Sequence, residues 1–204
     1  MKHKCTSPLE SIPRVAMFIS GRGSNMVALI KAMQSGEVQG VPALVISDQM
    51  DAPGLKHAAD LGILTASFKR SDHVSKVAFE LAILKALQQH QIDWIALAGY
   101  MSIVGTTLLT AFMNRIINIH PSLLPAFKGL NPQESALTYG VKYAGCTVHF
   151  VNEDVDGGAI IEQSVVEVKE DDTVESLSER ILAAEHVLYP KALQKVIIGD
   201  YFIR

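Results

Sequence analysis

The chain has 204 residues, of which 49% are hydrophobic, and its 18 basic and 21 acidic side chains give a net charge of −3. This length fits one domain with a substantial core, and the lack of a lysine- or arginine-rich tract argues against a nucleic-acid-binding surface. No apolar run reaches the roughly 18 residues that a membrane helix needs. The two cysteines, Cys5 and Cys146, predict no disulfide framework and favour a reducing compartment.

Apolar runs alternate with helical patterns along the first 125 residues. Strands are predicted at Arg14–Ser20, Val41–Ser47, Leu64–Phe68, Trp94–Ala98 and Arg115–Ile119. Four helices are predicted between them. The first has Met26, Leu29, Ile30 and Met33 at helical spacing and ends at Gly36, and the second covers Ala52–Asp60 before Gly62. The third is capped by Asp72 and has the apolar residues Val77, Leu81, Leu84 and Leu87, and the fourth lies between the last two strands. Strands that are apolar throughout indicate a mostly parallel sheet covered on both faces.

The pattern changes after Pro125. Two longer strands, GCTVHFVNE and AIIEQSVVEV, flank the segment DVDGG, and an Asp-Gly pair between such runs predicts an antiparallel hairpin. Asp172, with Glu175 three residues on, predicts a capping box for a last helix that Pro190 breaks or kinks. The apolar residues of that helix are Leu177, Ile181 and Leu188.

The predicted fold is therefore α/β: a mostly parallel, Rossmann-like sheet with helices on both faces, an antiparallel hairpin extension and a C-terminal helix. We expect residues 14–204 to form a single domain and residues 1–13 a flexible tail, which lacks the apolar region of a secretory signal. A cytoplasmic protein is the corresponding prediction.

The loop GRGSN, Gly21 to Asn25, stands between the first strand and the first helix. Its glycines let the backbone approach a ligand closely, and the helix N-terminus offers N–H groups to an anion such as phosphate. No GK[ST] follows, so this is not a Walker loop, and Met26 replaces the third glycine of a dinucleotide fingerprint. Asp48, at the end of the second strand, could still imitate a ribose-binding acid. The alternative is a tight strand–helix turn without a ligand.

The octapeptide NIHPSLLP ends another predicted strand with polar residues. Residues i and i+2 of a strand face the same side, so Asn118 and His120 point together into the space beyond the strand. The plain alternative is that Asn118 caps a turn and His120 is a hydrogen-bonded core histidine. Asp156 either shapes the hairpin turn or brings a carboxylate beside His120, which would fix the tautomer of the ring and stabilise its protonated form.

Two further polar residues lie in apolar surroundings. His149 falls inside CTVHF, where the strand context favours a structural role. Glu185 lies among small residues in AAEH on the last helix. It needs a partner or a ligand there, unless it stands at a solvated edge of the helix.

The segments SGRGSN, LAGYM, NIHPSLLP, GCTVHFV, DVDGG and AEHVLYP occur together in this order. From about Arg14 almost to its end, the chain resembles the phosphoribosylglycinamide formyltransferases, folate-dependent enzymes of purine synthesis. NIHPSLLP is typical of the formyltransferase superfamily, and SGRGSN with AEHVLYP narrows the resemblance to this member. It implies one formyltransferase catalytic domain over residues 14–204. It also implies that the amine of glycinamide ribonucleotide attacks the formyl carbon of 10-formyltetrahydrofolate, without a metal.

The resemblance also implies a set of site residues. The catalytic residues would be Asn118, His120 and Asp156. The phosphate and ribose of the substrate would be bound by Gly23, Ser24, Asn25 and Glu185. The folate would be bound by Lys76, Tyr100, Met101, Ser102, Ile103, Val104 and Asn118. Thr147, as an anchor for a water molecule, and His149 would support them.

The chemistry of formyl transfer agrees with this set. Amine attack on a formyl group creates a tetrahedral oxyanion and a surplus proton, and preorganised donors for that oxygen are usually the largest contribution to catalysis. The side-chain amide of Asn118 and a protonated His120 are suitable donors, and Asp156 favours that protonation. His120 or Asp156, directly or through water, would move the proton to the leaving group.

Four positions depart from the family pattern. Ser102 stands where many members have an arginine, and Lys76 stands where an arginine often meets the glutamate tail of the folate. Lys76 keeps the charge but loses the bidentate guanidinium fork. Gln133 replaces a usual histidine, and Leu182 replaces a polar residue that in some members reaches toward the phosphate. The resemblance therefore determines the reaction more closely than the substrate affinity or the pH response.

Three other functions are alternatives. A formyltetrahydrofolate hydrolase would share Asn118, His120 and Asp156, but such proteins carry an N-terminal regulatory domain, for which we expect 13 residues to be too few. A methionyl-tRNA formyltransferase would carry a C-terminal domain and a basic surface, which the charge does not favour. A nucleotide-binding module without catalysis would use GRGSN and Asp48. We expect small-molecule substrates, no nucleic acid or membrane partner, and a monomer or homodimer.

Overall fold

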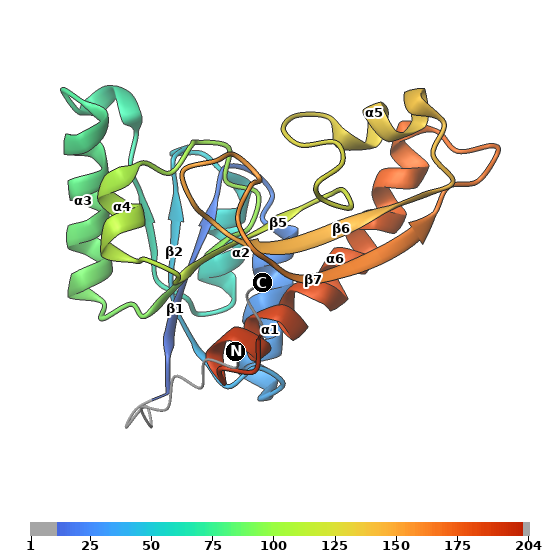
Figure 1. Cartoon of the computed structure of the whole chain (residues 1–204). Helices are drawn as coiled ribbons and strands as arrows, with labels where there is room; N and C mark the ends of the chain where they lie inside the picture. The colour runs from blue at the N-terminus through green and yellow to red at the C-terminus, as the bar shows by residue number, and fades with distance from the viewer. Residues whose placement is uncertain (1–11, 202–204) are drawn as a thin grey trace.

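The computed structural model describes residues 12–201, and within this range seven strands form one central sheet (Figure 1). The order of the strands is β3-β2-β1-β4-β5-β6-β7; β1 to β5 run parallel, and β6 and β7 are antiparallel to their neighbours. The strands are β1 (Arg14–Ile19), β2 (Val41–Ser47), β3 (Thr65–Ser67), β4 (Trp94–Leu97), β5 (Ile116–His120), β6 (Tyr143–Phe150) and β7 (Ile160–Glu167). The predicted mostly parallel α/β fold with an antiparallel hairpin is confirmed.

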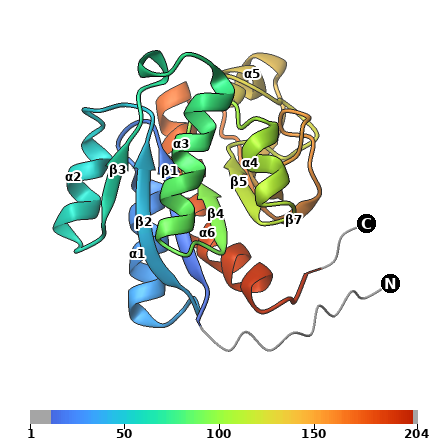
Figure 2. The same cartoon turned by 90° about the vertical axis from the view of Figure 1, so that its left-hand side faces the viewer.

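Helices cover both faces of the sheet (Figure 2). They are α1 (Ser24–Ser35), α2 (Pro53–Asp60), α3 (Lys76–Gln89), α4 (Thr106–Ala111), α5 (Pro132–Tyr139) and α6 (Val174–Ile197), with a 3-10 turn, η1 (Arg70–Asp72), before α3. One core lies between the sheet and α1 and α6, and a second lies between the other face and α3 and α4. Because Met17 enters the first core and Phe18 the second, β1 is apolar on both faces.

The order of the strands reverses at β1. The chain runs outward from β1 through β2 to β3, then returns to place β4 on the other side of β1. In open α/β sheets, ligands bind in the crevice at the carboxyl ends of the strands where such a reversal occurs. The loops that follow β1 and β4, which contain GRGSN and LAGYM, meet at this point.

Helix α3 begins later than predicted. Ser75 is its N-cap and accepts a hydrogen bond from the Ala78 amide at 3.0 Å, whereas Asp72 ends η1. Val77 and Leu81, expected to face inward, are 55% and 52% exposed. The buried side chains are Phe79, Glu80, Ile83 and Leu87. Apolar residues occur on more than one face of this helix, so their spacing alone could not select the buried face.

The hairpin connection is also longer than predicted. Pairing between β6 and β7 stops at His149 and Ile160, and residues 151–159 leave the sheet instead of forming a tight Asp-Gly turn. Within this segment Asp156 adopts a left-handed backbone, with φ +50°. The segment therefore carries Asp156 away from the sheet, toward the end of β5.

The capping box of α6 is formed by different residues from those predicted. Thr173 and Ser176 exchange the two side-chain-to-backbone hydrogen bonds, whereas Asp172 pairs with Arg180. The helix continues through Pro190 without a break. Proline removes one backbone hydrogen bond there, and the burial of Tyr189, Pro190 and Leu193 in the core offsets that loss.

The predicted N-terminal tail falls almost entirely on residues 1–11, which lie outside the described part of the chain, as does Cys5. Cys146 is a free, buried cysteine on β6. Across residues 12–201, no helix has both the length and the apolar character needed to span a membrane.

Candidate active site

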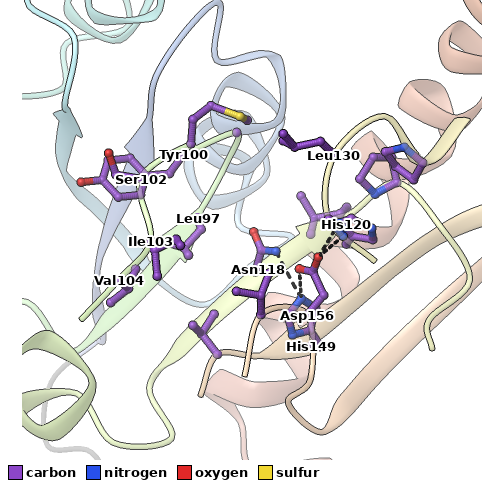
Figure 3. Close-up of a pocket in the computed structure, with 18 of the residues that line it drawn as sticks. Leu97, Tyr100, Ser102, Ile103, Val104, Asn118, His120, Leu130, His149 and Asp156 are labelled. Atoms are coloured by element: carbon purple, nitrogen blue, oxygen red, sulfur yellow. Dashed lines mark hydrogen bonds and ion pairs between the residues drawn. The ribbon is translucent and has the colours of Figure 1, made fainter. Parts of the chain in front are cut away.

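A cavity of about 560 Å³ opens at the carboxyl ends of β4 and β5 (Figure 3). Residues 99–104, which follow β4, form one wall, and residues 129–133 and 151–156 form the opposite side. Asn118 and His120 on β5 and His149 on β6 line its interior. Met101, Ile103 and Leu130 contribute exposed apolar side chains to the lining.

Asn118, His120 and Asp156 converge on this cavity. His120 Nδ1 lies 3.4 Å from Asp156 Oδ2, and the Gly129 amide donates a hydrogen bond to the same oxygen at 2.9 Å. Figure 3 shows the Asp156 carboxylate between the rings of His120 and His149, with Asn118 beside them. The structure thus brings together three side chains from two distant parts of the sequence.

His149 holds the side chain of Asn118. Its Nδ1 lies 2.8 Å from the Phe150 carbonyl oxygen and must donate there, so its Nε2 can accept a hydrogen bond from the Asn118 amide at 3.2 Å. The distance from Nε2 to Asp156 Oδ1 is 3.6 Å, too long for a good hydrogen bond. His149 therefore orients the amide of Asn118 and leaves the second N–H of that amide for a ligand.

His120 is buried, and both of its ring nitrogens face oxygen acceptors. Nδ1 faces Asp156, and Nε2 lies 2.9 Å from the carbonyl oxygen of Phe127, whose backbone has φ +52°. The Nε2 proton is therefore engaged by the loop between β5 and α5. A ligand oxygen can receive this proton only if it takes the place of the Phe127 carbonyl.

The charge of Asp156 is stabilised by its surroundings. Burial acts to raise the pKa of this carboxyl group, but the His149 ring when it is protonated, the Gly129 amide and the charge of His120 lower the pKa below its ordinary value of 3.8. Asp156 is consequently an anion at neutral pH, placed beside an imidazole.

Thr147 has a different task from the predicted one. Its hydroxyl donates to the Ser122 carbonyl at 2.7 Å and accepts from the Leu124 amide and the Gln163 side chain, both at 3.0 Å. The hydroxyl is thus fully occupied, and the residue does not line the cavity. Thr147 fixes the HPSLLP turn rather than anchoring a catalytic water molecule.

A second cavity of about 290 Å³ adjoins the first and contains the GRGSN loop. Its lining is Ser20–Asn25 with Ala98, Gly99 and Met101, and the last two residues also line the larger cavity. Gly23, with φ +69°, is the N-cap of α1. The first amides of a helix have no acceptor within the helix, so those of Ser24 and Asn25 are available to an anion in this cavity.

Glu185 reaches this loop from α6. The Asn25 side-chain amide donates to Glu185 Oε2 at 2.7 Å, and Glu185 is only 5% exposed. Burial raises the pKa of Glu185, and the hydrogen bond from Asn25 opposes that rise. Asn25 Oδ1 is itself buried and has no hydrogen-bond partner among the described residues. At the GRGSN loop, the pair therefore combines a carboxylate whose burial is unfavourable with a buried acceptor, Asn25 Oδ1, that has no donor among the described residues.

Most of the predicted folate residues line the larger cavity, but Lys76 does not. Tyr100, Met101, Ser102, Ile103 and Val104 all contribute to its wall. Lys76 is exposed at the start of α3, and its Cε lies beside Gly105, just beyond that wall.

The other departures from the family pattern fall in different places. The hydroxyl of Ser102 donates to Asp48, Gln133 lines the cavity, and Leu182 lies on α6 one turn before Glu185.

Tyr189 and Glu80 shape the site and were not recognised from the sequence, and Asp48 was considered there only as a ribose-binding acid. The Tyr189 hydroxyl donates to the Leu97 and Ile117 carbonyl oxygens at 2.9 and 3.2 Å, which ties β4 to β5 directly below the cavity. Glu80 accepts a hydrogen bond from the Gly105 amide, and Asp48 accepts one from Ser102. The available signal was a polar group in an apolar helix or strand, as for Glu185, but its partners lie far away in sequence.

Among residues 12–201, no group of three or more His, Cys, Asp or Glu side chains is arranged to hold a metal ion. The chemical groups that the site offers are amide, imidazole and carboxylate side chains together with backbone N–H groups.

Known proteins resemble this chain in both sequence and fold. Residues 13–193 match the family described as formyl transferase. The chain is 41% identical over 184 residues to the phosphoribosylglycinamide formyltransferase of Bacillus subtilis (strain 168), which covers 90% of this chain and 94% of that protein. Glycinamide ribonucleotide transformylase 1 from Symbiobacterium toebii superposes with a TM-score of 0.92 and 47% identity, covering 95% of this chain and 91% of that one.

A longer relative contains a similar segment. The trifunctional purine biosynthetic protein adenosine-3 of Chironomus tentans is 44% identical over 195 residues, which are 94% of this chain. The chain spans 14% of the length of that relative.

Proposed function

The chain belongs to the formyl transferase family, and we propose that it transfers the formyl group of 10-formyltetrahydrofolate to the amine of glycinamide ribonucleotide, a step of de novo purine biosynthesis. It is an enzyme of two small-molecule substrates that works in the cytoplasm, without a metal, as a monomer or homodimer. Residues 14–204 act as one catalytic domain.

The observation that carries this proposal is the junction of the two cavities. The smaller one offers the N-terminus of α1 and the GRGSN loop, here called the phosphate loop, to a phosphoribosyl group, with Glu185 hydrogen-bonded to Asn25 of that loop. The larger one offers a space lined with apolar side chains to a folate. Gly99 and Met101 line both. An amine on one ligand can therefore meet a formyl group on the other beside Asn118, His120 and Asp156.

The larger cavity supplies donors for the reaction. The substrate amine forms a bond to the formyl carbon, and the carbonyl oxygen becomes an oxyanion. The free N–H of the Asn118 amide and a protonated His120 donate to that oxygen, with Nε2 of His120 released from the Phe127 carbonyl. Such preorganised donors stabilise the transition state more than they stabilise the substrate.

The surplus proton must then move from the attacking amine to the leaving nitrogen. Collapse of the tetrahedral intermediate breaks the bond between the formyl carbon and N10 and returns the electron pair to that nitrogen. His120 or Asp156, directly or through water, carries the proton to it. Asp156, as an anion, also stabilises the charge that His120 bears during the transfer.

The acceptor of the formyl group is the decisive property to measure. Purified enzyme is incubated with 10-formyltetrahydrofolate with and without glycinamide ribonucleotide, and formylated ribonucleotide and free formate are followed in parallel. We expect the formylated product to form in proportion to tetrahydrofolate, with little formate. Formate release at the same rate without the ribonucleotide would instead assign the site to a hydrolase, for which water is the acceptor.

A further inference from the structure

The loop between β4 and α4, residues 99–105, forms one wall of the larger cavity and has no regular secondary structure; we call it the pocket loop. Two of its side chains, Met101 and Ile103, are 69% and 67% exposed. Such a loop binds a ligand in one geometry only if other groups fix its backbone. The contacts of the pocket loop with the rest of the fold therefore determine how firmly its backbone is held.

Two buried carboxylates hold the second half of the pocket loop. Ser102 Oγ donates to Asp48 Oδ2 at 2.5 Å, and the Gly105 amide donates to Glu80 Oε1 at 2.5 Å. Asp48 and Glu80 are only 7% and 3% exposed, and neither lines the cavity. Hydrogen bonds to a charged acceptor are roughly twice as strong as neutral ones, so these two contacts are effective anchors.

The hydrogen bond with Ser102 also stabilises the buried carboxylate of Asp48. The second carboxylate oxygen, Oδ1, is buried and has no hydrogen-bond partner among the described residues. Losing the Ser102 hydroxyl would remove the side-chain donor that compensates this buried carboxylate. The neighbouring residue Tyr100 adds an apolar contact, because its ring packs edge-on against Phe18 at a centroid distance of 5.3 Å.

Glu80 anchors the C-terminal end of the pocket loop, where its carboxylate lies close to the backbone of Gly105. A Cβ atom at Gly105 would lie 2.6 and 2.8 Å from the two Glu80 oxygens, so any larger residue would displace this carboxylate from its present position. The φ of Gly105 is −101°, which any residue can adopt. Space for Glu80, not backbone freedom, therefore explains the glycine.

We propose that Asp48 and Glu80 are positioning residues for the folate substrate, Asp48 acting through Ser102 and Glu80 through Gly105. The identity of the ligand rests on the proposed function; the anchoring of the pocket loop does not. The side chain of Ser102 thereby acts on Asp48, which is buried. It holds the backbone of the cavity wall instead of offering its side chain to the ligand.

A double-mutant cycle tests the first anchor. Asp48→Ala, Ser102→Ala and the double variant are compared with the parent enzyme in steady-state formyl transfer. We expect each single variant to raise the KM for 10-formyltetrahydrofolate about tenfold, the factor that corresponds to one charged hydrogen bond. The KM for glycinamide ribonucleotide should change less than about twofold. Because both residues act through one hydrogen bond, the double variant should be no worse than either single one.

Matched variants separate anchoring from general loss of stability. Ser102→Thr keeps the hydroxyl and should retain a KM close to that of the parent. Asp51→Ala, an exposed aspartate just after β2, should leave both KM values unchanged. At the other anchor, Glu80→Gln keeps an acceptor for the Gly105 amide, so it should raise the folate KM far less than Glu80→Ala.

Amide hydrogen exchange provides a readout that needs no substrate. Ser102→Ala should speed exchange at residues 101–105 while leaving the strands of the sheet protected. Unchanged exchange there, an unchanged folate KM in Asp48→Ala, or multiplied effects in the double variant would overturn the proposal. A parent enzyme that transfers no formyl group would contradict the proposed function instead, and the exchange experiment would still decide about the anchors.

Discussion

The charge of Asp156 is the single-residue feature on which the proposed chemistry depends most. Asparagine is nearly isosteric, suits the left-handed backbone at this position and still accepts the Gly129 hydrogen bond, but it carries no charge. We expect Asp156→Asn to lower kcat about 10²–10³-fold, the typical cost of losing one preorganised electrostatic group. Steady-state kinetics with both substrates at saturation measures this loss.

Binding and stability provide the control for that substitution. The affinity for glycinamide ribonucleotide should be unchanged in Asp156→Asn, because the phosphate loop and Glu185 are untouched. The folded pKa of Asp156 is lowered, so its charge contributes stability above the ordinary pKa of 3.8 and loses that contribution as pH falls through the folded value. Acid unfolding curves of the two proteins should therefore converge once the pH has fallen below the folded pKa of Asp156. A variant that keeps most of its turnover would return Asp156 to a purely structural role.

Glu185 shows the opposite shift, and its substitution should improve stability while it weakens function. Its folded pKa is raised above 4.5, so the unfolded chain releases this proton first and stability falls as pH rises from 4.5 through the folded value. Glutamine carries no proton to release. Its Nε2 could also donate to Asn25 Oδ1, which is buried without a partner in the described part of the chain. We expect Glu185→Gln to unfold at a higher temperature than the parent at pH 8 and at the same temperature at pH 4.

The cost of Glu185→Gln should appear in substrate binding. A carboxylate accepts hydrogen bonds from ribose hydroxyls more strongly than a neutral amide does, so we expect the KM for glycinamide ribonucleotide to rise about tenfold. The KM for 10-formyltetrahydrofolate provides the internal comparison and should not change. A lower unfolding temperature of Glu185→Gln than of the parent at pH 8 would contradict this prediction, because it would show that the Glu185 carboxylate stabilises the folded protein.

The sequence predicted the positions of some site residues but not of others. Asn118 and His120 were predicted to face one space because alternation along a strand is local geometry, and the structure places both in the same cavity. Asp156 and His149 reach that cavity through the pairing of β5 with β6 and the segment after it, which no local pattern describes. The sequence left Asp156 as either a turn residue or a partner of His120, and the resemblance favoured the second. Asp48 and Glu80 remained unassigned as anchors, because their partners are 54 and 25 residues away.

Among the elements, α2 is the one whose position shapes the phosphate loop. The Gly54 amide donates to the Gly21 carbonyl at 3.0 Å, and a Cβ at Gly54 would lie 2.8 Å from that oxygen and 2.5 Å from Ile19 Cδ1. The Ile19 side chain can turn aside, but the loop backbone has to move. We expect Gly54→Ala to weaken the binding of glycinamide ribonucleotide about tenfold, measured by titration calorimetry.

The helix itself should tolerate alanine. Gly54 is the second residue of α2, and alanine is more favourable than glycine in a helix, by up to about 1 kcal/mol in the interior, so the free energy of unfolding of Gly54→Ala should fall little. Lys56→Ala, on the same helix, removes only an exposed pair with Asp60 and should bind the ribonucleotide normally. Normal binding by Gly54→Ala would show that the loop adapts without loss.

The boundaries of elements were predicted less well than their existence. Asp72, Ser75, Asp172 and Thr173 can each cap a helix, and propensity does not distinguish a residue at the N-cap from one several positions earlier. At α6 the choice follows from the pairing of Asp172 with Arg180, a contact made only once the helix has formed. Pro190 was expected to break or kink α6 because it removes a backbone hydrogen bond, and the helix continues through it because its neighbours pack in the core.

At the scale of the whole molecule, the class of fold followed from the alternation of strands and helices, but the order of the strands did not. Periodicity identifies a parallel sheet without saying that β4 returns to the side of β1. That return brings the loops after β1 and β4 together and creates the junction of the two cavities. The resemblance of the chain to phosphoribosylglycinamide formyltransferases, confirmed by the comparisons, is what allowed the site to be assembled from the sequence.

Binding of glycinamide ribonucleotide should also stabilise the entire fold. Asn25 on α1 and Glu185 on α6 are 160 residues apart in sequence and meet at the smaller cavity, so a ribonucleotide bound there would join the first helix to the last. A ligand that binds only the folded state at 100 times its Kd adds about 2.7 kcal/mol to the free energy of unfolding. For a chain of this size that corresponds to a rise in Tm of about 5–10 °C. We expect glycinamide ribonucleotide to produce this rise in the parent enzyme and in Asp156→Asn alike, because the catalytic carboxylate lies outside the phosphate loop. Differential scanning calorimetry with the ribonucleotide as the only ligand measures both proteins. An unchanged Tm at millimolar ribonucleotide would show that the GRGSN loop and Glu185 do not hold this substrate, whereas a rise limited to the parent would place Asp156 in ground-state binding.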